Sequence, residues 1–84
     1  MRIPSEPVNF DPKQIEELNK KLSTLRHDVN NHLSLIMAAV ELIRHKPQMS
    51  ERMLATLAEQ PPKITAIVTK FTTEFEQAFG ITRN

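Results

Sequence analysis

The segment from residue 12 to residue 46, PKQIEELNKKLSTLRHDVNNHLSLIMAAVELIRHK, determines the architecture of this chain. Its apolar side chains recur in steps of three and four residues, which places them in one stripe along a helix. The stripe consists of Ile15, Leu18, Leu22, Leu25, Val29, Leu33, Ile36, Val40 and Ile43. No glycine or proline interrupts residues 13–46. At 1.5 Å per residue, we predict one helical rod of about 50 Å.

Local signals mark the ends of this first helix. Asp11 suits the N-cap, Pro12 suits the first helical position, and Gln14 completes a capping box with Asp11. Pro47 ends the helix because its ring clashes with the preceding turn and it lacks an N–H donor. Residues 1–10 contain two prolines and little periodicity. We expect them to form a flexible N-terminal arm.

A second helix is predicted over residues 51–79, with Ser50 as its N-cap and Gly80 as its stop. Its apolar stripe consists of Leu54, Leu57, Ile64, either Ile67 or Val68, Phe71, Phe75 and Phe79. Pro61 and Pro62 lie inside it and remove two backbone donors, so we expect a kink or a break there. Such a site is either a bend that follows the neighbouring helix or a hinge.

The fold class is therefore all-α, with residues 11–80 as an antiparallel helical hairpin and residues 81–84 as a tail. A lone hairpin leaves much of each stripe in water, and 84 residues are few for an independent core. Pairing two hairpins buries both stripes. We expect a homodimeric four-helix bundle with twofold symmetry. The competing arrangement is a monomer in which Phe10 and the arm fold back over the stripe.

Composition excludes several classes of protein. Eleven basic and ten acidic residues give a net charge of +1 without a basic block, which argues against binding of nucleic acid or an anionic membrane. The absence of cysteine excludes disulfides and thiolate metal sites. No apolar run approaches the roughly 20 residues that span a bilayer. We expect a cytoplasmic protein.

The run RHDVNNHL, residues 26–33, holds the side chains with the most chemistry. The helical phase puts His27 and Asn31 together on the side away from the apolar stripe, where both are expected to be exposed. A neutral imidazole can attack phosphorus. Asp28 is then a candidate to orient the ring or assist proton transfer, and Asn31 to bond a phosphoryl oxygen or position a water. Asp28 and His32 form a second pair spaced by four.

Two other readings of this run remain. Solvated helix faces often carry His, Asp and Asn, so the run is also compatible with an ordinary polar surface. The adjacent Asn30 and Asn31 argue against that reading, because asparagine is a poor helix former. A metal site is disfavoured because His27 and His32 do not share one helix face and only Asp28 could complete a ligand set.

Arg26-His27-Asp28 with Asn31, followed by an apolar run that ends at residues 41–43, resembles the phosphoacceptor box of sensor histidine kinases. That box lies in their dimerisation and histidine-phosphotransfer (DHp) domain. The version with Asn31-His32-Leu33 looks most like the sporulation-phosphorelay phosphotransferase type. In the commoner kinase type a proline follows the asparagine, where this chain has His32. The motif covers about twenty residues, and the hairpin pattern of residues 11–79 supports it.

The resemblance implies a role for each of three residues. His27 matches the phosphorylated histidine, Asp28 the adjacent acid that assists transfer, and Asn31 the residue that supports dephosphorylation of a partner's phospho-aspartate. The implied partner is the receiver domain of a response regulator, docked near the histidine, and a separate histidine kinase is a further candidate. No cofactor is expected on this chain, and any Mg²⁺ would belong to the receiver domain.

An ATP-binding domain is missing from this sequence. The chain has no room for one, and its single glycine, Gly80, excludes a glycine-rich phosphate loop. Autophosphorylation within the chain is therefore not expected. We predict a phosphotransfer protein or phospho-aspartate phosphatase, with a non-catalytic helical dimerisation or interaction module as the alternative. Met1 and the capped start fit an independent protein, and a fragment of a larger kinase is also compatible.

Overall fold

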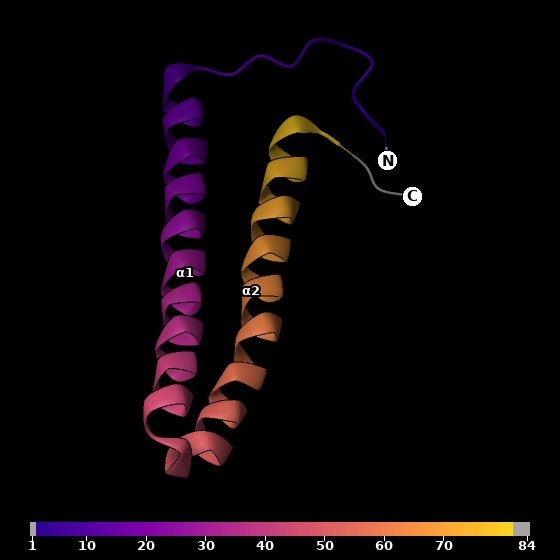
Figure 1. Cartoon of the computed structure of the whole chain (residues 1–84). Coiled ribbons are helices and arrows are strands. Elements are labelled where there is room, and N and C mark those ends of the chain that lie inside the picture. The colour runs from indigo at the N-terminus through magenta and orange to yellow at the C-terminus, as the bar shows by residue number, and fades with distance from the viewer. Residues whose placement is uncertain (1, 82–84) are drawn as a thin grey trace.

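The computed structural model describes residues 2–81 and contains two long antiparallel helices. Helix α1 spans Pro12–His45, a 3-10 turn η1 spans Pro47–Met49, and helix α2 spans Ser50–Phe79 (Figure 1). The predicted all-α hairpin is confirmed. Residues 82–84, most of the predicted tail, lie outside the described residues.

Helix α1 begins with the predicted capping box. The backbone N–H of Gln14 donates to Asp11 Oδ1 at 2.8 Å, and the backbone N–H of Asp11 donates to Gln14 Oε1 at 2.9 Å. Asp11 itself is extended, with φ −80° and ψ 165°. Two of the N–H groups left without partners at a helix start are thereby satisfied. At the other end, the N–H of Lys46 donates to the Leu42 carbonyl at 2.7 Å.

The predicted N-cap of α2 at Ser50 is wrong by one residue. The 3-10 turn brings the chain into helical geometry early, so Ser50 already has φ −54° and ψ −48°. Met49 therefore occupies the N-cap position, and it makes no side-chain capping bond. The turn itself supplies the local hydrogen bond, from the Met49 N–H to the Lys46 carbonyl at 2.9 Å.

Gly80 ends α2 as predicted. Its φ of 66° is left-handed, a conformation that glycine adopts without steric cost. The reversal lets the N–H of Ile81 donate to the Glu76 carbonyl at 2.8 Å and that of Gly80 to the Gln77 carbonyl at 3.4 Å. These two bonds form a Schellman motif, which satisfies carbonyls that the helix leaves open.

Pro61 and Pro62 lie within α2, which is one continuous helix across both of them. Of the two predicted alternatives, the break is absent. The kink stays a prediction.

The N-terminal arm crosses the open end of the hairpin (Figure 1). The Phe10 ring lies 4.6 Å from the Phe79 ring, which lies 4.6 Å from Phe75. A Cβ added at Gly80 would be 3.5 Å from Pro4 Cγ, so the arm also runs beside the end of α2. The arm therefore covers one end of the hairpin, while most of the length of the apolar stripes is left without it.

The hairpin is a layer one helix thick. Its principal extents are 59 × 29 × 12 Å. Among the apolar side chains of residues 2–81, only Ala39 is fully buried, at 2% exposure. Several large apolar side chains are exposed instead. None of the helices in this part of the chain has the length and apolar content that crossing a lipid bilayer requires.

Candidate functional site

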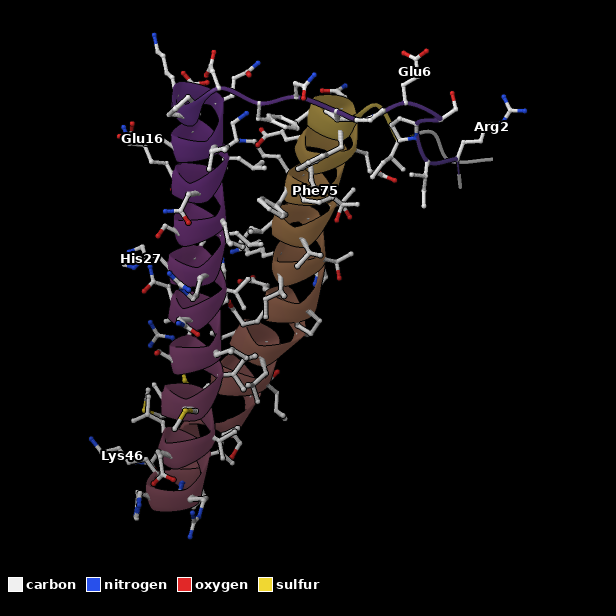
Figure 2. All side chains as sticks on the ribbon, turned by 90° about the horizontal axis from the view of Figure 1, so that it is seen from above. Arg2, Glu6, Glu16, His27, Lys46 and Phe75 are labelled. Carbon is white, nitrogen blue, oxygen red and sulfur yellow. The ribbon has the colours of Figure 1, made fainter. Side chains whose placement is uncertain are left out.

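His27 lies near the middle of α1 and points away from α2 (Figure 2). Asn31, one turn further along, places its Nδ2 3.4 Å from His27 Nε2, and both residues are exposed. The Asn31 amide nitrogen can donate to Nε2 in the tautomer of His27 that carries its ring proton on Nδ1. The structure thus brings the predicted histidine and asparagine together, with Nε2 as the ring nitrogen nearest the Asn31 amide.

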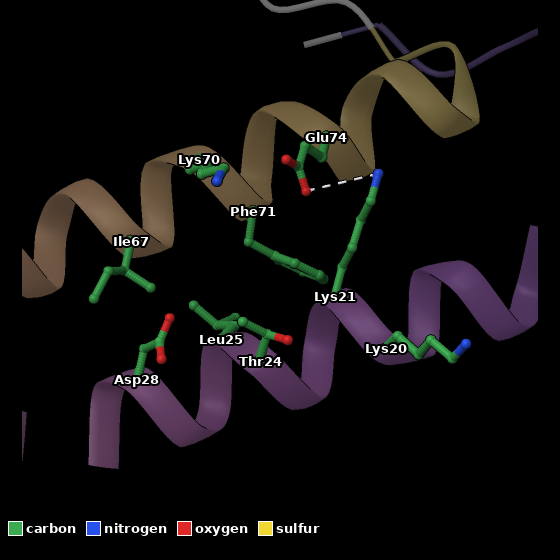
Figure 3. A pocket seen from close by; sticks show the side chains of 9 residues that line it. All are labelled: Lys20, Lys21, Thr24, Leu25, Asp28, Ile67, Lys70, Phe71 and Glu74. Carbon is green, nitrogen blue, oxygen red and sulfur yellow. Dashed lines mark ion pairs between the residues drawn. The ribbon is translucent and has the colours of Figure 1, made fainter. Parts of the chain in front are cut away.

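Asp28 has a different orientation from His27. Successive helical residues differ by roughly 100° in direction, and this rotation turns Asp28 toward α2. Its half-buried carboxylate lines a groove between the helices, close to Leu25 and Ile67 (Figure 3). The third residue of the predicted site is therefore next to His27 in sequence, but its carboxylate faces the second helix.

The groove beside Asp28 has a volume of about 440 Å³ and is open to solvent. Apolar side chains of both helices form its floor, and charged side chains form its rim. The floor includes Leu25, Ile67 and Phe71; the rim includes Lys20, Lys21, Asp28, Lys70 and Glu74 (Figure 3). One cross-helix ion pair lies on the rim, with Lys21 Nζ 3.8 Å from Glu74 Oε2. Protein interfaces in general also combine an apolar centre with a polar rim.

His32 makes a cross-helix hydrogen bond that the sequence reasoning missed. Its Nδ1 lies 2.7 Å from Gln60 Oε1, and Gln60 is only 2% exposed. The Nε2 of Gln60 donates to the Thr56 carbonyl at 2.9 Å, which fixes the direction of the amide. With its oxygen facing the ring, His32 must donate from Nδ1. The predicted pairing of His32 with Asp28 is replaced by a bond to α2.

A seven-residue spacing in the sequence could have identified this pair. His32 lies seven residues after Leu25 and seven before Ala39, so it shares their side of α1. Gln60 likewise lies seven residues after Met53. Both polar residues therefore occupy positions of the helix–helix seam.

A metal centre has no support in the geometry. Within residues 2–81 there is no group of three or more His, Cys, Asp or Glu side chains arranged to hold a metal ion. His27 and His32 diverge because one points away from α2 and the other bonds to it.

Comparison with models of known protein families, with characterised proteins and with solved structures found no match for this chain. Its function is therefore inferred from the residues around His27 and from the surfaces of the hairpin.

Proposed function

We propose that this chain is a cytoplasmic histidine phosphotransfer protein or phospho-aspartate phosphatase of two-component or phosphorelay signalling. It acts on the receiver domain of a response regulator, and His27 is its phosphoacceptor. The observation that carries the proposal is the exposed pair of His27 and Asn31, with Asn31 Nδ2 3.4 Å from His27 Nε2. A partner protein can reach this pair because it lies on the side of α1 away from α2 (Figure 2).

The transfer step uses the Nε2 lone pair of His27. This lone pair forms the N–P bond to the phosphoryl group of a receiver phospho-aspartate, and the P–O bond to the aspartyl carboxyl breaks. The carboxylate leaves with the electron pair. The proton on Nδ1 passes to water, which leaves the imidazole ring uncharged and the negative charge on the phosphoryl oxygens. The Asn31 amide, released from Nε2, donates to a phosphoryl oxygen in the same step.

The phosphatase reaction uses the same two residues with water as the nucleophile. The water oxygen bonds to phosphorus, the aspartyl P–O bond breaks, and inorganic phosphate and the free carboxylate result. Asn31 holds the attacking water through its amide, in the way that a glutamine orients water in GTP hydrolysis. Phosphate enters the chain from a phosphorylated receiver or from a separate histidine kinase.

The orientation of Asp28 favours a second candidate function. Its carboxylate faces the groove toward α2, where it contributes to a charged rim around an apolar floor. In a non-catalytic interaction module, this groove is a docking surface and the polar face around His27 takes no part in phosphate chemistry. The two candidates differ in whether the chain changes the phosphorylation of a receiver domain, by transfer to His27 or by hydrolysis.

A phosphotransfer assay separates the two functions. The chain is incubated with a panel of receiver domains labelled on aspartate, and two signals are followed: acid-labile, base-stable label on the chain and the rate of label loss from the receiver. We expect one receiver to respond in at least one signal, and His27→Gln to abolish transfer. His45→Gln is the matched control because His45 is an exposed histidine of the same helix, and it should behave like the unsubstituted chain.

Asn31→Ala tests the role of the amide in the same assay. Loss of one aligned donor is expected to slow release of receiver phosphate by roughly 100-fold. If the unsubstituted chain neither takes up label nor accelerates its loss from any receiver, the phosphotransfer function is wrong. Binding of a receiver without either signal would favour the interaction module.

A further inference from the structure

Arg26 immediately precedes His27 in the chain, and the proposed function gives it no role. Its exposed guanidinium donates from Nη2 to the Ser23 hydroxyl at 3.4 Å. Around the axis of α1, Ser23 lies roughly 60° from Arg26 on one side and roughly 40° from His27 on the other. The contact therefore brings the guanidinium from its own side of the helix toward the face that carries His27.

The positive charge of Arg26 has no carboxylate partner among residues 2–81, where the ion pairs involve other basic side chains. By contrast, Arg44, the other arginine of α1, places its Nη1 3.3 Å from Glu41 Oε1. A guanidinium that contacts only a hydroxyl keeps most of its N–H donors for another acceptor. Its planar fork matches two oxygens of a phosphoryl group with parallel hydrogen bonds. Arg26 is thus available to bind an anion.

The residues one turn before and one turn after His27 carry no negative charge. They are Ser23, Thr24, Asn30 and Asn31, and all four are exposed. Each has a hydroxyl or an amide that can donate to an anion. The adjacent carboxylate, Asp28, faces the groove toward α2 instead (Figure 3). A phosphoryl group that approaches His27 therefore meets hydrogen-bond donors.

His45, the other exposed histidine of α1, has the opposite surroundings. Its Nε2 lies 3.1 Å from Glu41 Oε2. A carboxylate at this distance repels a phosphoryl group, which is itself negatively charged. The two exposed histidines therefore differ in what an anion meets: an amide and a nearby guanidinium at His27, and a carboxylate at His45.

We propose that Arg26 binds the phosphoryl oxygens at His27, during transfer and after the N–P bond has formed. This role rests on the proposed function, because it supplies the anion-binding group of the same site. In the resting protein the guanidinium contacts Ser23; when a phosphoryl group arrives, it donates to the phosphoryl oxygens together with the Asn31 amide. Arg26 thereby places positive charge where phosphoryl transfer spreads negative charge over the equatorial oxygens.

Chemical phosphorylation tests this role without a partner protein. Phosphoramidate donates its phosphoryl group to imidazole: a bond forms between His27 Nε2 and phosphorus, the N–P bond of the reagent breaks, ammonia leaves, and the Nδ1 proton passes to water. Mass spectrometry locates the modified histidines and measures their rates of formation. We expect His27 to react about fivefold faster than His45, and Arg26→Ala to remove most of this preference.

Arg44→Ala is the matched control, because Arg44 is an exposed arginine of the same helix, and it should leave the rate at His27 unchanged. Arg26→Lys keeps the charge without the planar fork, so it should restore part of the rate. The effect of Arg26→Ala should shrink at about 1 M salt, which screens exposed charges beyond about 3 Å. A purely structural role of Arg26 would not give this salt dependence.

The outcomes separate the role of Arg26 from the proposed function. Equal rates at His27 in the unsubstituted chain and in Arg26→Ala would overturn the proposal, as would faster modification of His45 than of His27. Receivers that phosphorylate Arg26→Ala as fast as the unsubstituted chain would also overturn it and leave the phosphotransfer function standing. A rate at His27 that depends on Arg26, with no response from any receiver, would support the anion-binding role and count against phosphotransfer.

Discussion

His32 and Gln60 form a polar pair in the seam between the two helices, and the seam residues one heptad away from them are apolar. Ala39 is fully buried one heptad after His32, and Ile67 follows Gln60 by the same spacing. A buried hydrogen bond adds little net stability over an apolar pair, but a misaligned pairing would leave both groups without partners. We infer that this bond fixes the register of α1 against α2, as a buried asparagine does in coiled coils.

Gln60→Ala should destabilise the protein because it leaves the His32 Nδ1–H without its acceptor. The expected loss in the free energy of unfolding is about 1–3 kcal/mol, measured by urea denaturation. Gln77→Ala is the control, since Gln77 is an exposed glutamine of the same helix. The double variant His32→Leu/Gln60→Leu should be near neutral or more stable than the unsubstituted chain. A loss for Gln60→Ala no larger than for Gln77→Ala would contradict the assigned bond.

The residue scale also shows what helical phase can and cannot predict. The proximity of His27 and Asn31 was predicted from their spacing of four residues on one helix. The structure places Asn31 Nδ2 3.4 Å from His27 Nε2. The surroundings of Asp28 and His32 depend on where α2 lies around α1. The apolar stripe of α1 is broad, so its centre did not indicate which edge meets the second helix, and the bond from His32 to α2 was missed.

At the scale of single elements, local chemistry predicted most boundaries. The capping box at Asp11 and the glycine at residue 80 act through bonds within a few residues, so sequence signals suffice to place them. The N-cap of α2 was predicted one residue too late. The connection between the helices is a 3-10 turn, and such a turn depends on how the two helices pack rather than on local signals. The continuity of α2 across the double proline could also not be predicted from helix propensity, because tertiary packing can override that propensity.

Pro62→Ala tests how much the double proline costs α2. Pro62 is exposed, and its replacement restores a backbone N–H that can donate to the carbonyl of Ala58. Part of the gain is offset because alanine leaves the unfolded chain more flexible. We expect the free energy of unfolding to rise by about 1–3 kcal/mol. Pro7→Ala, in the arm, is the control and should change it by less than about 0.5 kcal/mol. A destabilised Pro62→Ala would indicate that the proline geometry is needed for packing.

At the scale of the whole molecule, the sequence predicted the least about the candidate site. The groove beside Asp28 combines residues more than forty positions apart, and its rim depends on the register of the two helices. The arm crosses the open end of the hairpin and Phe10 contacts Phe79, the last residue of the α2 stripe, a placement that the sequence did not specify. The predicted flexibility of the arm stays a prediction. Such placements depend on distant segments, which local periodicity does not describe.

Thermal unfolding should depend on protein concentration if two hairpins share one core. In the predicted homodimer, unfolding would be coupled to dissociation, because a hairpin only 12 Å thick buries little apolar surface without a partner. Raising the concentration 100-fold then stabilises the folded dimer by about 2.7 kcal/mol. For two chains of 84 residues, this corresponds to an increase in Tm of about 8 °C. The measurement is circular dichroism at 1 µM and 100 µM.

Two variants distinguish this coupling from non-specific association. In the predicted homodimer, an apolar face that includes Leu33, Val40, Val68 and Phe75, all exposed in the single hairpin, would be covered. Leu35 lies roughly 200° around α1 from Leu33, so Leu35→Glu should retain the concentration dependence of the unsubstituted chain. Leu33→Glu places a carboxylate in the centre of that face, and burying an unpaired charge there prevents pairing. Its Tm should be lower and the same at both concentrations. A Tm of the unsubstituted chain that does not change over this range would mean that the hairpin is stable alone, because a unimolecular transition has no concentration term.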